Sequence, residues 1–505
     1  MCCFGLILLI SLASTLNSVC AYEPNWKSLD TRPLPTWYDE AKFGIFCHWG
    51  VFSVPAFKAD WFWYFWKGPT PDPDILKFME KNYKPGFSYG DFAPLFTAEL
   101  FNPTTFAKIV KSSGAKYYVP TSKHCEGFTN WPSAYSWNWN AVDVGPHRDL
   151  IGELREAILG IGGVHFGFYF SQYEWFNRLY WTDKAANFSS QTYVNEVSYP
   201  QMVELVNNYK PDILWSDGDW EAADTYWNSE RFLAWLFTDS PVAKNVVVND
   251  RWGAGLTGKH GSFYSFSDHF DPGHIIPHKW ENCMMLDKNN WMTSRTMTAA
   301  DVHTLNELIT QLARTISCNG NLLLNAGATH DGRIIPIFEE RLSEVGAWLA
   351  VNGEAVYKTK PWIHQNDSNV WYTSKLRSTH NKNPYRVYNL QNEQNTIVYA
   401  FVLDWPKNGK LILPSIQVTS RTRAQMLGCK GALSVVSSQD GAVIDISQIG
   451  FTQLPSLTAW VIKLEYLATE VFDPVNDMIE KGWLTTDGFP LRYSTEHHRR
   501  SRSAN

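Results

Sequence analysis

The sequence predicts an α/β fold, a (β/α)8-like TIM barrel, followed by a C-terminal all-β sandwich domain. Two observations predict the barrel. Between about residues 40 and 350, apolar runs rich in β-forming residues alternate with helical patterns. Runs that are apolar throughout are typical of parallel strands buried on both faces, and many repeats of the unit favour a barrel over an open sheet. No Gly-rich phosphate loop follows the first run, as it would in a doubly wound sheet.

The elements of the predicted barrel follow one another along the chain. Each strand is a short apolar or aromatic run, and each helix has apolar residues at a spacing of three to four. The expected strands are 43–49, 116–124, 165–171, 212–217, 245–250 and 320–325. The expected helices include 103–114, 147–160, 201–210 and 302–317.

A third observation predicts the second domain. From about residue 356 the chain changes to short alternating runs separated by turn residues, a pattern typical of a β-sandwich. The expected strands there are 370–375, 385–390, 396–405, 410–416 and 457–467.

The N-terminal 21 residues have the pattern of a cleaved signal peptide, a short apolar run followed by small residues, although Lys and Arg are missing from its start. No later segment offers the ~20 apolar residues that span a bilayer. The sequons at Asn187 and Asn366 also fit the secretory pathway. The predicted segments are a signal peptide (1–21), a catalytic barrel (22–355), a β-sandwich (356–470) and a partly disordered extension (471–505).

Net charge and cysteine content limit the binding partners, disulfides and metal sites that we expect. A net charge of -6 and a pI near 6.2 give no electrostatic footprint for nucleic acid or an anionic membrane, so we expect a neutral partner. Five cysteines remain after residue 21, and this odd number leaves at least one thiol unpaired or paired with another chain. Cys47-His48 and His124-Cys125 could together ligate zinc, but neither has a known zinc-motif spacing, and we expect no metal.

Polar residues follow five of the expected strands where each strand ends. In a parallel barrel these positions converge over the mouth. Five such groups in succession, with Trp and His among them, predict a pocket that grips a small polar ligand. The groups are His48, 123–126, 170–172, 215–217 and 249–251.

Asp217, in "ILWSDGDWE" (213–221), is the leading candidate for chemistry. It ends an expected strand, and Trp215 offers an apolar wall beside it. Two carboxylates across such a pocket are the equipment of glycoside hydrolysis: one attacks or stabilises the sugar carbon and the other protonates the leaving oxygen. The second carboxylate is either Glu281 or Asp268, both in a segment that the sequence predicts to be rich in loops.

At these residues the sequence resembles the α-L-fucosidases of glycoside hydrolase family 29, particularly the animal lysosomal type, from about residue 24 to 467. Motifs of this length in this order are specific to the family. They are "WYDEAKFGIFCHWGVFSVPAF" (37–57), "SKHCEGFTNWPSAYSWNWNAVDVGPHRDLIGEL" (122–154), "YKPDILWSDGDWEAADTYWNS" (209–229), "VVVNDRWG" (246–253) and "GNLLLNAGATHDGRI" (320–334).

The resemblance implies a barrel followed by a β-sandwich, and retaining hydrolysis through a covalent fucosyl intermediate without a metal or organic cofactor. It implies that Asp217 is the nucleophile. The acid/base differs between branches of the family, and Glu281 matches one assignment and Asp268 the other. The sugar contacts carried over by the resemblance are His48, His124, Trp215 and Arg251.

The sequence departs from the family pattern at three expected sugar contacts. Cys125 stands where the family has a second consecutive His, Asp60 where it has Glu before Trp61, and Phe170 where it has His or Tyr. Each hydroxyl left unpaired in a closed pocket costs about 1–3 kcal/mol. A weakened enzyme or a shifted substrate preference is therefore a hypothesis to test.

The leading hypothesis is a lysosomal or secreted α-L-fucosidase that removes terminal fucose from glycoproteins or glycolipids. The alternative is a fucose-binding, lectin-like homologue with weakened catalysis, motivated by Cys125, Asp60 and Phe170. A third hypothesis is a hydrolase of a different sugar in the same barrel. Because family members are commonly oligomeric, the resemblance also suggests a homo-oligomer.

Overall fold

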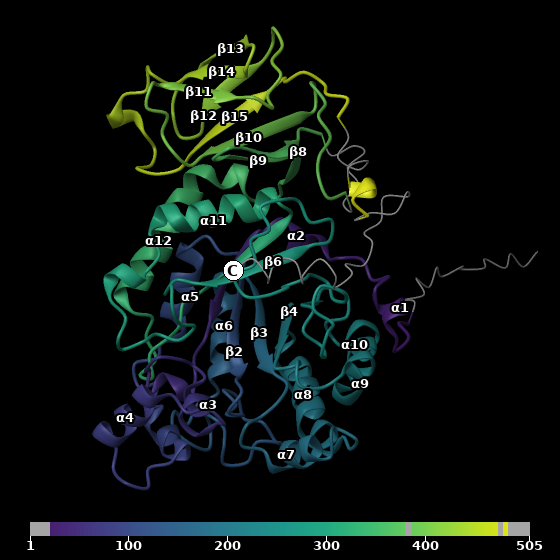
Figure 1. Cartoon of the computed structure of the whole chain (residues 1–505), viewed down its shortest axis with the longest axis vertical. Coiled ribbons are helices and arrows are strands. Elements are labelled where there is room, and N and C mark those ends of the chain that lie inside the picture. Colours follow the sequence, from purple (N-terminus) through teal and green to yellow (C-terminus); the bar gives the residue numbers. More distant parts are fainter. Residues whose placement is uncertain (1–20, 379–385, 473–477, 483–505) are drawn as a thin grey trace, which may run out of the picture.

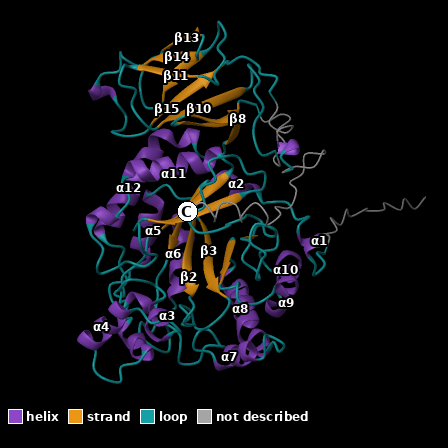
Figure 2. Cartoon of the chain, in the orientation of Figure 1, coloured by secondary structure: helices purple, strands orange, loops and turns teal. Residues whose placement is uncertain are grey.

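A parallel sheet surrounded by helices carries a separate antiparallel β domain at one end (Figures 1 and 2). The computed structural model describes residues 21–378, 386–472 and 478–482. Helices α11 (Leu305–Ser317) and α12 (Pro336–Asn352) lie between the two parts in Figure 1. The predicted combination of a barrel and a C-terminal β domain is confirmed.

The barrel sheet has seven parallel strands among the described residues, in the order β5-β4-β3-β2-β1-β7-β6. Six of them match expected strands. The strand β6 was not expected, because Glu281 and Asn282 interrupt its apolar run, and the prediction of loops there was wrong. The bounds are β1 Phe43–Cys47, β2 Tyr117–Lys123, β3 His165–Ser171, β4 Ile213–Asp217, β5 Val247–Val248, β6 Trp280–Met285 and β7 Gly320–Asn325.

A short segment, 262–264, closes the gap between β5 and β6. The Ser262 amide donates to the Val248 carbonyl at 2.9 Å. On the other side the Tyr264 amide donates to the Lys279 carbonyl, and the Glu281 amide donates back to Tyr264, both at 2.9 Å. This segment therefore fills the eighth position of the barrel without being a regular strand.

Helices cover the outside of the barrel. Helix α5 begins at Pro103, where the Asn102 side chain accepts from the Thr105 amide, and α11 begins after a capping box of Thr304 and Glu307. Helix α6 begins after Asp149, whose side chain accepts from the Gly152 amide. These caps explain why the helices predicted from 147 and 302 start three residues later. The remaining bounds are α1 Trp26–Leu29, α2 Thr36–Ala41, α3 Phe62–Lys67, α4 Pro73–Asn82, α5 Pro103–Ser112, α6 Leu150–Ile161, α7 Arg178–Ala185, α8 Tyr199–Tyr209, α9 Asp224–Trp227 and α10 Ser229–Thr238.

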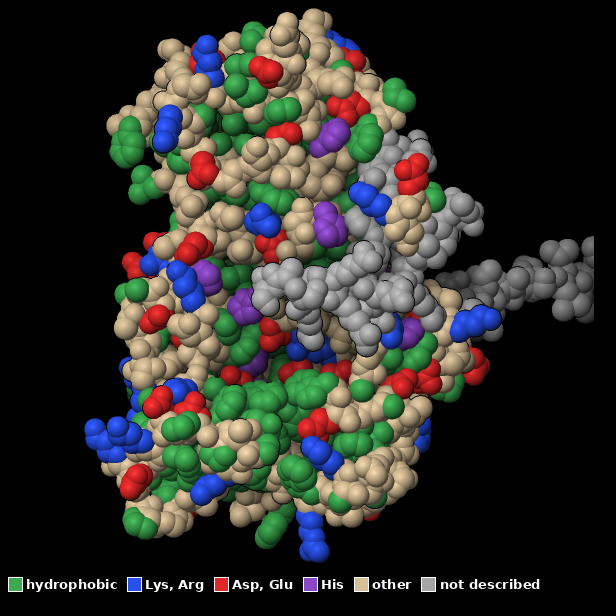
Figure 3. Space-filling view, in the orientation of Figure 1, with side chains coloured by type: hydrophobic (Ala, Val, Ile, Leu, Met, Phe, Trp, Pro, Cys, Tyr) green, Lys and Arg blue, Asp and Glu red, His purple; other side chains and the backbone are tan. Residues whose placement is uncertain are grey.

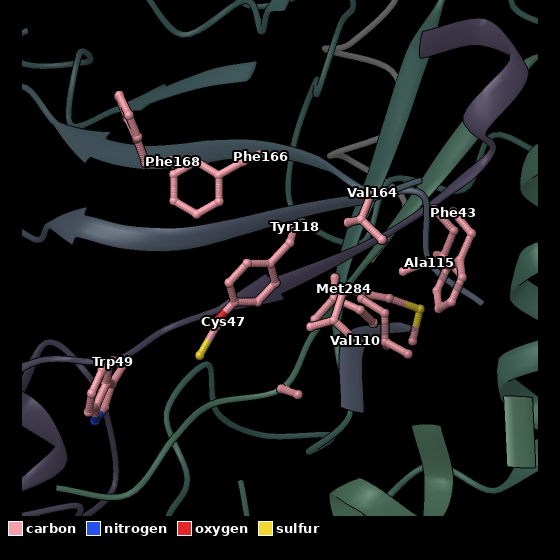
Figure 4. Close-up of a cluster of buried hydrophobic side chains, with 14 of the residues drawn as sticks. Phe43, Cys47, Trp49, Val110, Ala115, Tyr118, Val164, Phe166, Phe168 and Met284 are labelled. Carbon is pink, nitrogen blue, oxygen red and sulfur yellow. The ribbon is translucent and has the colours of Figure 1, made fainter. Parts of the chain in front are cut away.

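Strand side chains alternate between two apolar layers. Tyr169 and Trp215 belong to the buried cluster inside the barrel. Their neighbours Phe166 and Phe168 belong to the outer layer between sheet and helices, together with Val110 of α5, as Figure 4 shows. This period of two decides which side chains can reach the barrel interior.

The C-terminal domain pairs a five-stranded antiparallel sheet, β12-β15-β10-β9-β8, with a three-stranded one, β11-β14-β13. One apolar cluster fills the space between them. Four expected strands are present, whereas β8, β12, β13 and β14 were not expected, in part because they are short or polar. The bounds are β8 Lys360–Asp367, β9 Val370–Leu376, β10 Thr396–Val402, β11 Lys410–Leu413, β12 Arg423–Met426, β13 Ser434–Ser438, β14 Gly441–Asp445 and β15 Trp460–Glu465.

Some predictions fall at the edges of the described chain. The expected strand 385–390 contributes only the bridge of Asn389 to Trp362, and residue 385 lies outside the described residues. The signal peptide, apart from residue 21, and most of 471–505 also lie outside them, so these two assignments stay predictions. Within the described chain no helix has the length and apolar character needed to cross a bilayer.

Candidate active site

Asp217 lies at the carboxyl end of β4, where the barrel opens. Its side chain is 14% exposed. The Tyr169 hydroxyl donates to one carboxylate oxygen at 2.7 Å, and Nη1 of Arg251 donates to the other at 3.0 Å. Two donors thus fix the orientation of the carboxylate and leave it at the barrel mouth.

Arg251 joins Asp217 to a second acid. Its Nη2 donates to Asp268 at 2.6 Å and its Nε to Ser265 at 3.0 Å, while the guanidinium lies 4.6 Å from the centre of the Trp215 ring. Burial opposes the charge of Arg251, but the two carboxylates outweigh it and raise the arginine pKa. One permanently charged group therefore holds both acids on the same side of the pocket.

Asp268 lies in the long loop between β5 and β6, and its side chain is 41% exposed. Partial enclosure would raise its pKa, but the charge and hydrogen bond of Arg251 lower it. The Cys283 thiol lies 3.6 Å from the same carboxylate oxygen. Asp268 can thus meet both a ligand in the mouth and solvent.

Glu281 lies inside the barrel, 1% exposed. The hydroxyls of Tyr38 and Tyr117 both donate to Oε2 at 2.7 Å, and Nε1 of Trp215 donates to Oε1 at 2.9 Å. Burial raises the pKa of Glu281, and these three donors partly offset the effect. The structure therefore brings Asp268, and not Glu281, to the guanidinium that holds Asp217.

His48 follows β1 and is buried beside the carboxylates. Its Nδ1 lies 3.0 Å from Oδ1 of Asn325, which also accepts from the His48 amide at 2.9 Å. Burial, and next the charge of His124, lower the pKa of His48 to about 4. The imidazole is therefore neutral above that pH, and the Asn325 contact leaves Nε2 for a ligand.

His124, after β2, lies between two acids. Its Nε2 is 3.3 Å from Asp60 and its Nδ1 is 3.5 Å from Glu126. Burial alone would lower the pKa of His124, but neighbouring Cys125 and the two acids raise it well above the ordinary value. Burial would likewise raise the pKa of Asp60, and the contact with His124 lowers it.

Phe170 does not lie in the pocket, and that prediction is corrected. Phe170 pairs in register with Ser216, whereas Tyr169 pairs with Trp215. Since Trp215 points into the barrel, Tyr169 does too, and the Phe170 ring packs outside, 4.2 Å from the Lys123 ammonium. Tyr169, which sequence reasoning missed, is the residue of β3 that contacts Asp217, and the period of two along β3 was the signal for it.

Cys125 is fully buried in an aromatic cluster with Tyr173 and Trp175, and its thiol lies 3.7 Å from the Ser171 hydroxyl. Asp60 still reaches His124 despite its shorter side chain. Of the three departures from the family pattern, Phe170 is thus outside the pocket and Asp60 keeps a partner. These observations remove most of the reason for the hypothesis that catalysis is weakened.

Aromatic rings form two walls around the polar groups. Trp61 stacks on Trp220 at 5.8 Å and meets Trp175 edge to face at 5.4 Å. Trp291, which sequence reasoning did not select, packs 5.0 Å from His48 and is partly exposed. Polar donors framed by flat rings suit a small hydroxyl-rich ligand with an apolar face.

The five cysteines after residue 21 are all unpaired, four of them buried. Cys47 and Cys125 lie in different clusters, and within the described ranges no three or more Cys, His, Asp or Glu side chains are gathered as a metal site would require.

Two family models match the chain. A model described as alpha-L-fucosidase matches residues 9–354, and one described as the alpha-L-fucosidase C-terminal domain matches 364–465.

Curated relatives match this chain along nearly its whole length. An alpha-L-fucosidase of Branchiostoma floridae is 53% identical over 465 residues, covering 91% of this chain and 99% of the relative. The human tissue alpha-L-fucosidase is 50% identical, covering 88% and 91% respectively. The crystal structure of the Thermotoga maritima alpha-fucosidase superposes with a TM-score of 0.70 at 28% identity, covering 88% of this chain and 99% of that one. From these matches and the geometry at Arg251, the chain belongs to the α-L-fucosidase family of glycoside hydrolases.

Proposed function

We propose that this protein is a retaining α-L-fucosidase in which Asp217 is the nucleophile and Asp268 is the acid/base. The observation that carries this assignment is the Arg251 guanidinium, which contacts both carboxylates at the barrel mouth. Retaining enzymes hold their two carboxyl groups ~5–5.5 Å apart, and a pair bridged by a single guanidinium is compatible with that spacing.

Asp217 is prepared to attack as an anion. Arg251 and the Tyr169 hydroxyl both bind its ionised form and aim it along the direction in which β4 ends. Attack on the anomeric carbon forms a fucosyl ester and expels the leaving oxygen. The positive charge that develops on the sugar ring is stabilised by the same carboxylate.

Asp268 has to give a proton in the first step and take one in the second. In the free protein Arg251 lowers its pKa, so substrate has to loosen this contact before Asp268 can act as an acid. Once Asp217 is esterified its negative charge is gone, and Arg251 then favours the ionised Asp268 that activates water. The shared arginine thus suits both halves of the reaction.

His48, His124 and the aromatic walls supply the sugar contacts in this proposal. Neutral His48 can exchange hydrogen bonds with a hydroxyl through Nε2, and charged His124 can donate once a hydroxyl displaces part of its contact with Asp60. Trp61 and Trp291 offer flat faces to the ring and methyl group of fucose. Glu281 keeps a structural role beneath Trp215.

The cellular compartment and the molecules that carry the fucose are proposed from the relatives. We propose a secreted or lysosomal enzyme acting on terminal fucose of glycoproteins or glycolipids, in line with relatives named tissue and plasma alpha-L-fucosidases. Asn187 and Asn366 are exposed, as N-glycosylation would need. A homo-oligomer is also proposed, and size-exclusion chromatography with light scattering tests it.

An aryl α-L-fucoside tests the activity. The wild type should release the phenol and a fucose whose anomeric configuration is retained. NMR of the first sugar product measures that configuration. Asp217→Gly should lower turnover by at least about 10³-fold. Added azide should partly restore turnover by acting as an external nucleophile, and the fucosyl azide formed should have the inverted configuration. Glu221→Gln, an acid of the same loop that pairs with Lys184, serves as the control. Binding of fucose without any turnover would favour the lectin-like alternative and overturn the proposal.

A further inference from the structure

Asn325 is the last residue of β7 and is buried at the carboxyl end of the barrel. Its Oδ1 accepts from the His48 amide at 2.9 Å and lies 3.0 Å from Nδ1 of the His48 ring. Its Nδ2 donates to the Trp291 carbonyl at 2.5 Å. This one side chain therefore contacts two residues, His48 and Trp291, to which the proposed function gives sugar contacts.

The two backbone partners determine the orientation of the Asn325 amide. A backbone N–H can only donate, so the atom that meets the His48 amide has to be the oxygen. A backbone carbonyl can only accept, so the atom that meets the Trp291 carbonyl has to be the NH2 group. The flipped amide would place donor against donor and acceptor against acceptor, and both contacts exclude it.

The oxygen of Asn325 in turn determines which ring nitrogen of His48 carries a proton. Oδ1 has two lone pairs and no hydrogen, so it can accept from the His48 amide and from the His48 ring at once. Nδ1 therefore has to be protonated, and in the neutral ring the lone pair is on Nε2. None of the described residues forms a hydrogen bond with Nε2, so this lone pair is available to a ligand.

The charged groups around His48 decide whether its ring is neutral. Figure 3 shows histidine, acidic and basic side chains next to one another in the middle of one face, above a patch of hydrophobic ones. Burial, and next the charge of His124, lower the pKa of His48, while Asp60 and Asp217 raise it, and the result is about 4. The Tyr169 ring is centred 5.2 Å from that of His48, and its hydroxyl is already bound to Asp217. Above that pH, Nε2 of His48 can only accept a hydrogen bond.

His124 has the opposite hydrogen-bonding character. It lies between Asp60 and Glu126, and its pKa is raised well above the ordinary value, so both of its ring nitrogens are protonated and can only donate. A hydroxyl group satisfies either histidine, because it both donates and accepts. A fluorine atom, or an ether or ester oxygen, has no proton to donate and therefore suits His124 but not His48.

We propose that Asn325 is a positioning residue that makes His48 a hydrogen-bond acceptor for one hydroxyl of the substrate sugar. The proposal rests on the proposed function and adds a rule of specificity. The hydroxyl that meets His48 has to be free, because a methylated, acylated or fluorinated position leaves Nε2 without a donor. Asn325 also holds the backbone of Trp291, whose ring is centred 5.0 Å from that of His48, so it fixes the acceptor and the flat wall relative to each other.

NMR of the full-length protein with ¹⁵N-labelled histidine measures the tautomer directly. At a pH well above 4, wild-type His48, identified by its absence from His48→Gln, should have a protonated Nδ1 and an unprotonated Nε2. In Asn325→Ala the proton on Nδ1 has no acceptor, so Nε2 should be protonated in a large part of the molecules. A protonated Nε2 in neutral wild-type His48 overturns the inference, whether or not the variant folds. An unchanged tautomer in folded Asn325→Ala also overturns it.

Asn352→Ala is the matched control for this measurement. Asn352 is likewise buried and donates to a backbone carbonyl, that of Trp348 at 3.1 Å, but it is on α12. Its loss should destabilise the protein and leave the tautomer of His48 unchanged. A shift of the tautomer in Asn352→Ala as large as that in Asn325→Ala would mean that general loosening of the fold moves the proton, and the inference would fail.

Kinetics on fluorinated substrates test the rule of specificity. Three aryl α-L-fucosides each carry fluorine in place of one ring hydroxyl, and each is compared with the parent fucoside. For one of the three, the loss of kcat/KM should be about tenfold greater in the wild type than in Asn325→Ala, the effect of one buried hydrogen bond. Comparing the losses between two proteins cancels the effect of fluorine on the chemistry.

The outcomes separate this inference from the proposed function. Equal losses in the two proteins for all three fluorinated substrates overturn the role of Asn325 in specificity. Absence of turnover of the parent fucoside by the wild type would instead reject the proposed function, and the NMR measurement would still decide which nitrogen of His48 is protonated.

Discussion

Asp268 and Glu281 are both linked to Trp215 but have contrasting surroundings. The Trp215 ring faces the arginine that holds Asp268, while its indole N–H binds Glu281. Asp268 is on a loop, partly exposed, and its charged partner is shared with Asp217. Glu281 is on a strand, buried, and bound by three donors.

This difference is the reason for our proposal that Asp268 reacts and Glu281 is structural. An acid/base group has to exchange a proton with substrate and with water, so it needs access and a partner that can be displaced. A carboxylate whose oxygens are already occupied inside a closed core gives up stability if it loses one donor. By this criterion Asp268 fits catalysis, and Glu281 fits the positioning of Trp215.

The largest effect that sharpens this contrast should come from Asp268→Asn. Loss of the acid/base should lower kcat by about 10²–10⁴-fold, because general acid catalysis contributes that much. The loss should be greater for a sugar leaving group than for an acidic phenol, which needs little protonation. Steady-state kinetics on both substrates provide the measurement. Equal losses would mean that Asp268 acts only through Arg251.

Tyr169→Phe should have the next largest effect. It removes a hydrogen bond to the Asp217 carboxylate, worth about 1.5–3 kcal/mol for a charged acceptor, and should lower kcat/KM about tenfold to a hundredfold. Phe170→Leu, on the outer face of the same strand, is the matched control. If Phe170→Leu had the greater effect on kcat/KM at equal thermal stability, our assignment of Tyr169 would be wrong.

Glu281→Gln should act on stability more than on chemistry. Tyr38 and Tyr117 both donate to one oxygen of Glu281, and an amide accepts such a pair less well. We expect the free energy of unfolding to fall by about 1–3 kcal/mol, measured by urea denaturation, with kcat little changed below the melting temperature. A loss of kcat as large as that of Asp268→Asn in folded protein would instead support Glu281 as the acid.

The smallest expected effect is the contribution of His48 to the pH dependence of stability. The unfolded chain protonates this group near its ordinary pKa of 6.5, whereas the folded protein does so only near 4. The contribution of His48 to stability is therefore present above pH 6.5 and is lost as the pH falls toward 4. Between pH 6.5 and 5.5 it should drop by about 1 kcal/mol. His48→Gln should flatten the melting temperature over this interval, and an unchanged slope would contradict the shift.

Hydrophobic patterning predicted the barrel and the position of Asp217, because strands buried on both faces leave long apolar runs and the residue after each run falls at the mouth. It failed at β6, where Glu281 and Asn282 are tolerated inside the core by specific donors that only the folded chain brings together. It also failed at the choice between Tyr169 and Phe170, although strand alternation anchored on Trp215 would have resolved it. No local pattern could rank Asp268 above Glu281, since their difference arises from contacts with residues distant in sequence.

The loop that bears Asp268 also completes the ring of strands, for 262–264 bridges the two-residue strand β5 to β6. Asp250 ties this loop down by accepting from the amides of Gly258, Ser265 and Phe266. If Asp268 is the proton donor, as we propose, a chain that leaves this seam open would lack that donor while Asp217 stays in place. Turnover would then begin only when the last seam of the barrel has sealed, and enzyme assays during refolding would time that event.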